Sequence, residues 1–171
     1  MIAPNPLDLT STRLVLFDDI KARLASVQQG KPVITGGTDT YVNTVRSVKD
    51  IPAAVASFDD GEMPGCALWD LGTVFTPDSS GASAAAVWRL GIILAVRDYS
   101  EADDRATRIM RLLESLFRDV SRALFATEAC QAGGADVNYS LDAWLADYDD
   151  PETGIGWIEM TVTYNEVFQV Q

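Results

Sequence analysis

The sequence contains no histidine, the residue that serves most often as a general base and as a metal ligand. Its serines therefore lack the usual base that would activate a nucleophile. The two cysteines, Cys66 and Cys130, lie far apart and form no CxxC pair, so neither a zinc site nor a redox motif is predicted. From these absences we predict no catalytic residue, no metal site and no cofactor, and we expect that the protein is not an enzyme.

Long apolar runs are also missing. No window of about 20 residues is apolar enough to span a bilayer, and the opening residues, which include Pro4 and Pro6, lack the basic and apolar regions of a signal peptide. We therefore expect a protein without a membrane segment, made in a reducing cytoplasm. There Cys66 and Cys130 should both be free and buried, with a single disulfide between them as the alternative.

Basic residues are scarce, because 13 Lys and Arg stand against 25 Asp and Glu and give a formal net charge of -12. Such a balance opposes a general affinity for the nucleic-acid backbone or for an anionic membrane. A row of arginines between residues 105 and 122 is the exception. Acidic residues four positions earlier, as in Glu114 before Arg118, predict ion pairs within one helix, so we do not expect this row to bind nucleic acid.

The remaining composition, with 47% hydrophobic and 22% charged residues among 171, is typical of a globular domain. We predict a single domain over residues 1–171, in which residues 1–9 form an extended lead-in. Hydroxyl residues at positions 10–12 precede apolar residues spaced three or four apart from Leu14 to Val27. This pattern predicts a first amphipathic helix.

The rest of the chain is organised around residues 86–125. Alternate positions from Trp88 to Val96 are all apolar, which predicts a strand with one buried face, while the other row of this strand is mixed. Ser100 and Asp103 resemble a capping box and predict the start of a long helix. Its apolar positions form a single stripe and are Ala102, Ala106, Ile109, Leu113, Leu116, Val120 and Leu124.

Two further strands are predicted before this unit, over residues 40–48 and 66–70. Residues 50–64, between them, contain several Pro, Gly and acidic residues and should be mainly loop, with one helical turn at residues 53–57.

Residues 71–83 are rich in Gly, Pro, Ser and Asp, which predicts a loop of about a dozen residues. A connection of this length is uncommon in a compact domain unless it is functional or mobile. We interpret this loop, with Phe75, Pro77 and Asp78, as a candidate contact surface. A mobile tip without a partner is the alternative.

The C-terminal part predicts a β-hairpin, because residues 137–145 and 158–164 both alternate between apolar and polar positions. An acidic turn at residues 147–152 joins them and has the character of a cation site. It lacks the glycine at the sixth position and the distal Glu of a calcium loop. We therefore favour a solvated turn without a metal ion.

Two tryptophans fall on the polar rows of these last strands. By strict alternation Trp144 and Trp157 both point away from the predicted core. Aromatic side chains on an outer face suggest a second buried contact, either with the first helix or with another subunit. We therefore add Trp144 and Trp157 to the candidate interface.

The predicted order is a helix, three strands, a helix and two strands. Strands covered by helices on one face describe an α+β fold. We predict a two-layer sandwich with a mostly antiparallel sheet of about five strands and two main helices packed on it.

Three segments carry a family resemblance. They are an opening helix with the sequence Leu14-Val15-Leu16-Phe17-Asp18-Asp19-Ile20, a long apolar strand from Trp88 to Asp98 that leads directly into an Asp- and Arg-rich helix, and a closing strand at 158–167 that contains Tyr164. This layout, over residues 12–168, resembles the phage tail terminator (tail completion) proteins of long-tailed phages and phage-like particles. It includes no diagnostic motif, and no catalytic residue is carried over.

The resemblance implies a virion structural protein whose copies form a ring, usually a homohexamer, that caps the finished tail tube and meets the head-side connector or neck protein. DNA would pass through this ring without specific binding, and the excess of acidic groups would favour this. The implied location is the tail or neck of the virion, after assembly in the host cytoplasm. The alternatives are another head-tail neck or completion protein, or an acidic binding module outside any virion, of the inhibitor, immunity or DNA-mimic type.

Overall fold

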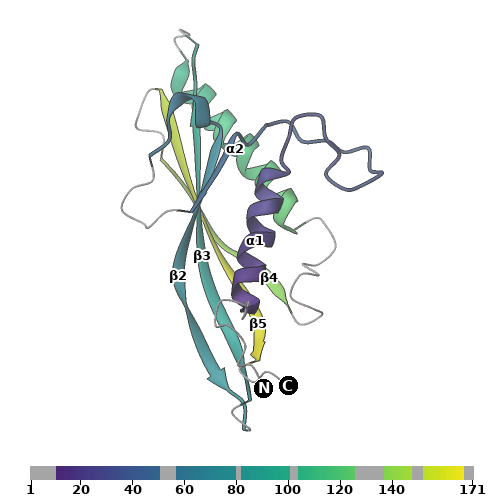
Figure 1. The fold of residues 1–171 in the computed structure, drawn as a ribbon. Coiled ribbons are helices and arrows are strands. Elements are labelled where there is room, and N and C mark those ends of the chain that lie inside the picture. The colour runs from purple at the N-terminus through teal and green to yellow at the C-terminus, as the bar shows by residue number, and fades with distance from the viewer. Residues whose placement is uncertain are drawn as a thin grey trace, which may run out of the picture.

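The structure is a computed structural model that describes residues 11–50, 57–79, 82–100, 104–125, 137–147 and 152–167. Its elements in chain order are α1 (Thr12–Ala25), β1 (Ser47–Asp50), the 3-10 helix η2 (Asp60–Glu62), β2 (Gly65–Pro77), β3 (Ser83–Arg97), α2 (Arg105–Phe125), β4 (Asn138–Asp147) and β5 (Thr153–Val167). The predicted order of main helices and strands is confirmed (Figure 1). The predicted lead-in at residues 1–9 lies outside the described residues.

The five strands form one sheet in the order β1-β2-β3-β5-β4. Strand β1 is parallel to β2, and every other neighbouring pair is antiparallel. Helices α1 and α2 pack on the same face of this sheet (Figure 1), so the predicted two-layer α+β fold is confirmed. We call the face that carries the two helices the covered face and the opposite one the uncovered face.

The covered face holds the hydrophobic core. The predicted apolar row from Trp88 to Val96 is buried throughout, and the side chain of Trp88 is 0% exposed. The ring of Trp88 lies 6.0 Å from that of Phe17 on α1, and its Nε1 donates a 2.9 Å hydrogen bond to Asp70 on β2. Because apolar surface removed from water contributes about 25 cal/mol per Å², this row is a main source of the stability of the fold.

Helix α1 begins where the sequence predicts it. Ser11 is the N-cap residue, and its hydroxyl accepts a 3.2 Å hydrogen bond from a backbone N–H of the first turn. The backbone N of Thr12 donates a 3.2 Å hydrogen bond to Glu166 of β5, and Arg13 forms an ion pair with Asp70 of β2. These contacts fix the start of α1 to both of these strands.

Helix α2 follows β3 through a corner built around Asp98. The carboxylate of Asp98 accepts hydrogen bonds from the backbone N of Ser100 at 3.0 Å, from its hydroxyl at 2.7 Å and from Nε of Arg108 at 3.0 Å. The hydrogen bonds from Ser100, supported by the charge of Arg108, hold the pKa of Asp98 below its ordinary value. The predicted capping residue Asp103 lies outside the described residues, so the visible anchor of this corner is Asp98.

The predicted stripe of α2 is confirmed along most of the helix. Its buried members are Ile109, Leu113, Leu116, Val120 and Leu124. Ala106 is exposed, so the prediction is wrong at this position, and Ala102 is not among the described residues. Ion pairs from Arg105 to Glu152 and from Arg108 to Asp98, rather than apolar contacts, hold the first turn.

An arm formed by residues 26–46 projects from the helix layer between α1 and β1 (Figure 1). Its base is held by Asp119 of α2, which is 0% exposed. One carboxylate oxygen of Asp119 accepts hydrogen bonds of 2.8 Å from the backbone N of Val42, from the backbone N of Asn43 and from the side-chain amide of Asn43. A buried carboxylate thus fixes the arm to α2.

The predicted strand at residues 40–48 is wrong over most of its length. Thr40 forms only an isolated bridge with Pro32, and β1 begins at Ser47. The physical reason lies in the backbone N–H groups of Val42 and Asn43, because these donate to Asp119 rather than to a neighbouring strand.

The predicted loop at residues 71–83 is also wrong, because β2 and β3 pair as far as Pro77 and Ala84. Gly72 has a φ of 103° and lies in a β-bulge next to Asp70. The turn-forming residues are thus absorbed into a long hairpin, since cross-strand pairing outweighs local propensity. Most of the helical turn predicted at residues 53–57 lies outside the described residues, and the only helical turn described in this region is η2.

Candidate interaction surface

Large apolar side chains from four strands share the uncovered face of the sheet. Successive residues of a strand point to opposite faces, and the pairing register shows which residues lie side by side. The apolar set consists of Trp69 and Val74 on β2, Val87 and Ile93 on β3, Leu145 on β4, and Ile155 and Trp157 on β5. Neither α1 nor α2 packs on this set, so the uncovered face is the first candidate for a contact surface.

Two tryptophans form the centre of this face. The rings of Trp69 and Trp157 meet edge to face, with centroids 4.8 Å apart and an interplanar angle of 80°. The indole of Trp157 lies over Gly91 of β3, where a Cβ atom would come within 2.6 Å of the ring. Gly91 therefore provides the space in which Trp157 lies flat on the sheet, half-buried by its own chain.

Aliphatic side chains flank this centre and are open to solvent. Val74 is 69% exposed beside Val87, and Leu145 is 63% exposed beside Trp157. Arg89 and Glu159 form a 3.2 Å ion pair on the same face. An exposed apolar area with polar groups around it is typical of a surface that contacts another protein.

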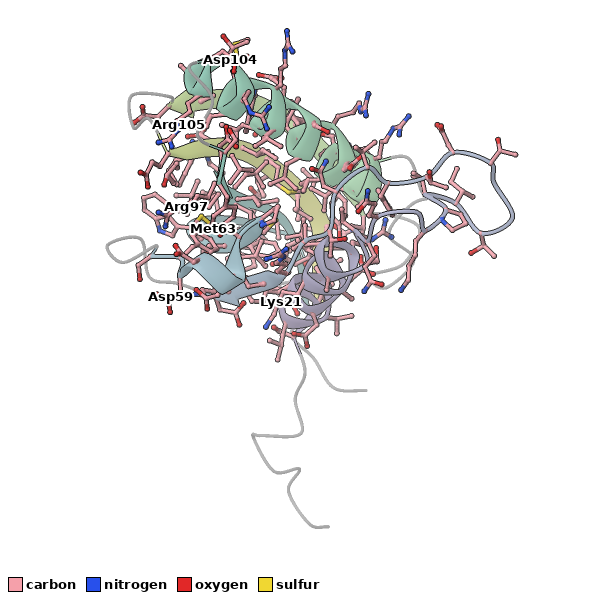
Figure 2. The ribbon with its side chains drawn as sticks, turned by 90° about the horizontal axis from the view of Figure 1, so that it is seen from above. Lys21, Asp59, Met63, Arg97, Asp104 and Arg105 are labelled. Carbon is pink, nitrogen blue, oxygen red and sulfur yellow. The ribbon has the colours of Figure 1, made fainter. Side chains whose placement is uncertain are left out.

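Residues 57–64 cover one end of the uncovered face. Arg97 forms an ion pair with Asp60, and the hydroxyl of Tyr99 donates a 2.7 Å hydrogen bond to the backbone oxygen of Asp60. Met63 of this segment is buried, and Figure 2 shows it near Arg97. The exposed apolar area is therefore confined to the remaining part of the face.

The sheet also has two open edges in the described part of the chain. Strand β1 pairs only with residues 65–68 of β2, so residues 69–77 have a strand on one side alone. At the other end of the sheet, β4 pairs only with β5. Unpaired backbone N–H and C=O groups along an edge can accept a strand from another chain.

Three of the predicted contact residues lie at the far end of the β2–β3 hairpin. Phe75 and Pro77 belong to β2, and Phe75 is exposed. Asp78 closes the turn, since its backbone N donates a 3.0 Å hydrogen bond to the backbone oxygen of Ser83 and its carboxylate accepts a 2.7 Å hydrogen bond from the Ser83 hydroxyl. The structure thus places these residues on an ordered hairpin rather than on a long loop.

The two tryptophans predicted to lie together are on opposite faces. Trp157 is on the outer row, as predicted, but it packs on Trp69 rather than on α1. Trp144 is on the covered face, so its prediction is wrong. Its ring stacks on Phe117 of α2 with centroids 4.3 Å apart, and its Nε1 donates a 3.1 Å hydrogen bond to Glu114.

A β-bulge explains this error. The register of β4 against β5 shifts between Leu141 and Ala143, and Asp142 at the shift accepts a 2.5 Å hydrogen bond from the hydroxyl of Thr161. One extra residue reverses the alternation of the strand. Trp144 therefore faces α2, and Leu145 takes its place on the uncovered face.

Among the described residues there is neither a cluster that could hold a metal ion nor a reactive thiol. They contain no group of three Cys, Asp or Glu side chains arranged to hold a metal ion, although Asp149 and Asp150 of the predicted acidic turn lie outside them. Burial raises the pKa of the Cys66 thiol to about 12, which leaves it protonated and unreactive. Cys130 also lies outside the described residues. No helix described here is long and apolar enough to cross a membrane.

Sequence reasoning missed Trp69, Val74 and Leu145. Trp69 falls in a predicted strand, and its alternation with Leu68 could have placed it on the outer face. Val74 was missed because a loop was predicted at its position, and Leu145 was missed because the bulge reverses the alternation of β4. Comparison with known proteins adds no assignment, because no protein-family model matches the chain and no curated protein sequence matches it significantly.

Proposed function

We propose that this chain is a virion structural protein, a tail terminator whose copies form a ring that caps the tail tube and joins it to the head-side connector. The observation that supports this best is the uncovered face, where exposed aliphatic side chains and two tryptophans from four strands form a surface suited to protein contact. The layout that resembles the terminator family is the second support.

The proposed partners are further copies of the chain, six in a full ring, together with the tail tube protein and a connector or neck protein. DNA passes through the ring without specific binding. The charges of the uncovered face agree with this role, because Lys49, Arg89 and Arg97 each form an ion pair with an acidic residue. Paired in this way, they offer little attraction to phosphate groups.

Deletion of the gene in the particle that carries it tests this function. We expect separate heads and tails by electron microscopy, and joined particles again when the gene is supplied in trans. Joined, infectious particles from the deletion strain would exclude the terminator role. A defect confined to the neck, with tails of normal length and a normal end, would instead favour the neighbouring neck protein.

A second candidate rests on the net charge of -12, which favours an acidic binding module that acts on a basic protein. This candidate predicts a monomer that binds one basic partner in a 1:1 complex. Affinity capture with the tagged chain distinguishes the two, since recovery of tail proteins supports the terminator, and recovery of one basic protein in equal amount supports the module.

A further inference from the structure

Two hollows accompany the two open edges of the sheet, both on its covered side. The α1 hollow, beside β2, measures about 390 Å³ and is lined by Ser11, Arg13, Leu14, Phe17 and Asp70. The α2 hollow, beside β4, measures about 480 Å³ and is lined by Phe117, Arg118, Ser121, Arg122, Phe125 and Leu141. Each edge thus combines open backbone groups with an apolar recess.

Each hollow has an exposed leucine that a neighbouring copy could cover. Leu14 in the α1 hollow is 50% exposed, and Leu141 in the α2 hollow is 41% exposed. A joint between the two would remove both leucines from water.

The directions of β2 and β4 also favour a contact between these two edges. Strand β4 is antiparallel to β5, β5 to β3, and β3 to β2, so β4 and β2 run in opposite directions within one sheet. A second copy placed beside the first in the same orientation would therefore present its β4 antiparallel to β2. Antiparallel pairing is the more common and slightly more stable arrangement.

We infer that copies of this chain join head to tail, with β4 of one copy paired to residues 69–77 of β2 in the next and Leu141 seated in the α1 hollow. Phe75, exposed on the same strand, extends the contact. This inference rests on the proposed self-association and specifies its surface. Because the two halves of the joint differ, the contact is heterologous, and its repetition gives a ring when the rotation between copies closes.

Strand β1 defines the offset between neighbouring copies. It occupies residues 65–68 of β2, so a neighbouring β4 has only residues 69–77 to pair with. The neighbour is therefore displaced along the strand direction. A stagger of this kind is what a sheet needs to close into a barrel.

Two variants that each block one half of the joint test the inference. Leu14→Arg blocks the α1 hollow, and Leu141→Arg blocks the β4 edge. Each should weaken self-association by about 100-fold or more, because Asp70 is already paired with Arg13 and the introduced guanidinium would be buried without a partner of its own. Met110→Arg is the control, since Met110 is 42% exposed on α2 and lines neither hollow. Light scattering after size exclusion measures the mass, and circular dichroism confirms folding.

Mixing the two variants is the decisive step. Leu14→Arg keeps a working β4 edge and Leu141→Arg keeps a working α1 hollow, so an equal mixture should form a 1:1 dimer although each variant alone is monomeric. A mixture that remains monomeric would overturn the head-to-tail joint. Assembly of either variant like the Met110→Arg control would overturn it too, while leaving the ring itself intact. A wild-type monomer at all concentrations would count against both the ring and this joint.

Hydrogen exchange gives an independent measurement of the same joint. The backbone amides of residues 69–77 and of β4 should exchange about tenfold more slowly in the assembly than in the Leu141→Arg monomer, because strand pairing removes them from water. Protection confined to the arm at residues 26–46 would place the joint there and overturn the inference.

Discussion

Tryptophan side chains on the two faces of one sheet have different surroundings. On the covered face Trp88 is 0% exposed, contacts Phe17 of α1 and donates a hydrogen bond to Asp70. On the uncovered face Trp157 is half-buried, and its ring contacts Trp69 and lies over Gly91. The covered face is closed by two helices, whereas the uncovered face, apart from the end under residues 57–64, is closed only by its own side chains.

The two faces of the same strands therefore have different roles. Residues that point to the helices determine whether the chain folds, and residues that point away are free to serve contacts with other proteins. Substitutions matched across the two faces should therefore separate stability from assembly.

The largest effect is expected for Trp88→Ala. Loss of this ring from the core should lower the free energy of unfolding by about 3–5 kcal/mol. Trp157→Ala, its matched variant on the uncovered face, should cost about 1 kcal/mol, because the ring is half-buried and solvent can fill its place. Urea denaturation followed by circular dichroism gives both values. Equal losses for the two variants would contradict the contrast between the faces.

A smaller loss is expected for Asp119→Ala, at the base of the arm. The backbone N–H groups of Val42 and Asn43 would lose their acceptor, at a cost of about 2–3 kcal/mol. Asp119→Asn retains an oxygen acceptor and should cost less. Thermal melts measure the stability, and hydrogen exchange should report loss of protection at residues 42 and 43. Unchanged protection in Asp119→Ala would show that other contacts hold the arm.

The smallest effect on stability is expected for Leu145→Lys on the uncovered face. Leu145 is already exposed to solvent, so the free energy of unfolding should change by no more than about 0.5 kcal/mol. The same variant should fail to restore joined particles in the deletion strain, because a charge would enter the contact surface. Met110→Lys, on the helix layer, is the control. Full complementation by Leu145→Lys would remove this face from the proposed interface.

Much of the covered face could be predicted from sequence. The alternation from Trp88 to Val96 and the three- and four-residue spacing of α2 are local patterns, and both led to buried residues. The first helix was predictable for the same reason, with Ser11 as its cap. These elements are those in which local propensity and tertiary packing agree.

The errors occur where a distant residue overrides the local pattern. The backbone of Val42 and Asn43 bonds to Asp119, which is remote in sequence, and so does not form a strand. Residues 71–77 carry turn-forming side chains, yet they pair with the extended start of β3. Neither partner can be identified from the segment itself, because long-range pairing decides the outcome.

The bulge at Asp142 means that β4 carries one residue more than its pairing with β5 requires. Removal of this residue would restore the regular pleat and leave Trp144 on the helix side and Leu145 on the solvent side, because Ala143 would still pair with Glu159. A single codon could thus be lost at this position during evolution while both faces of the strand stayed the same. Related chains should accordingly be aligned on the apolar pattern that follows this insertion, with a gap placed at the bulge.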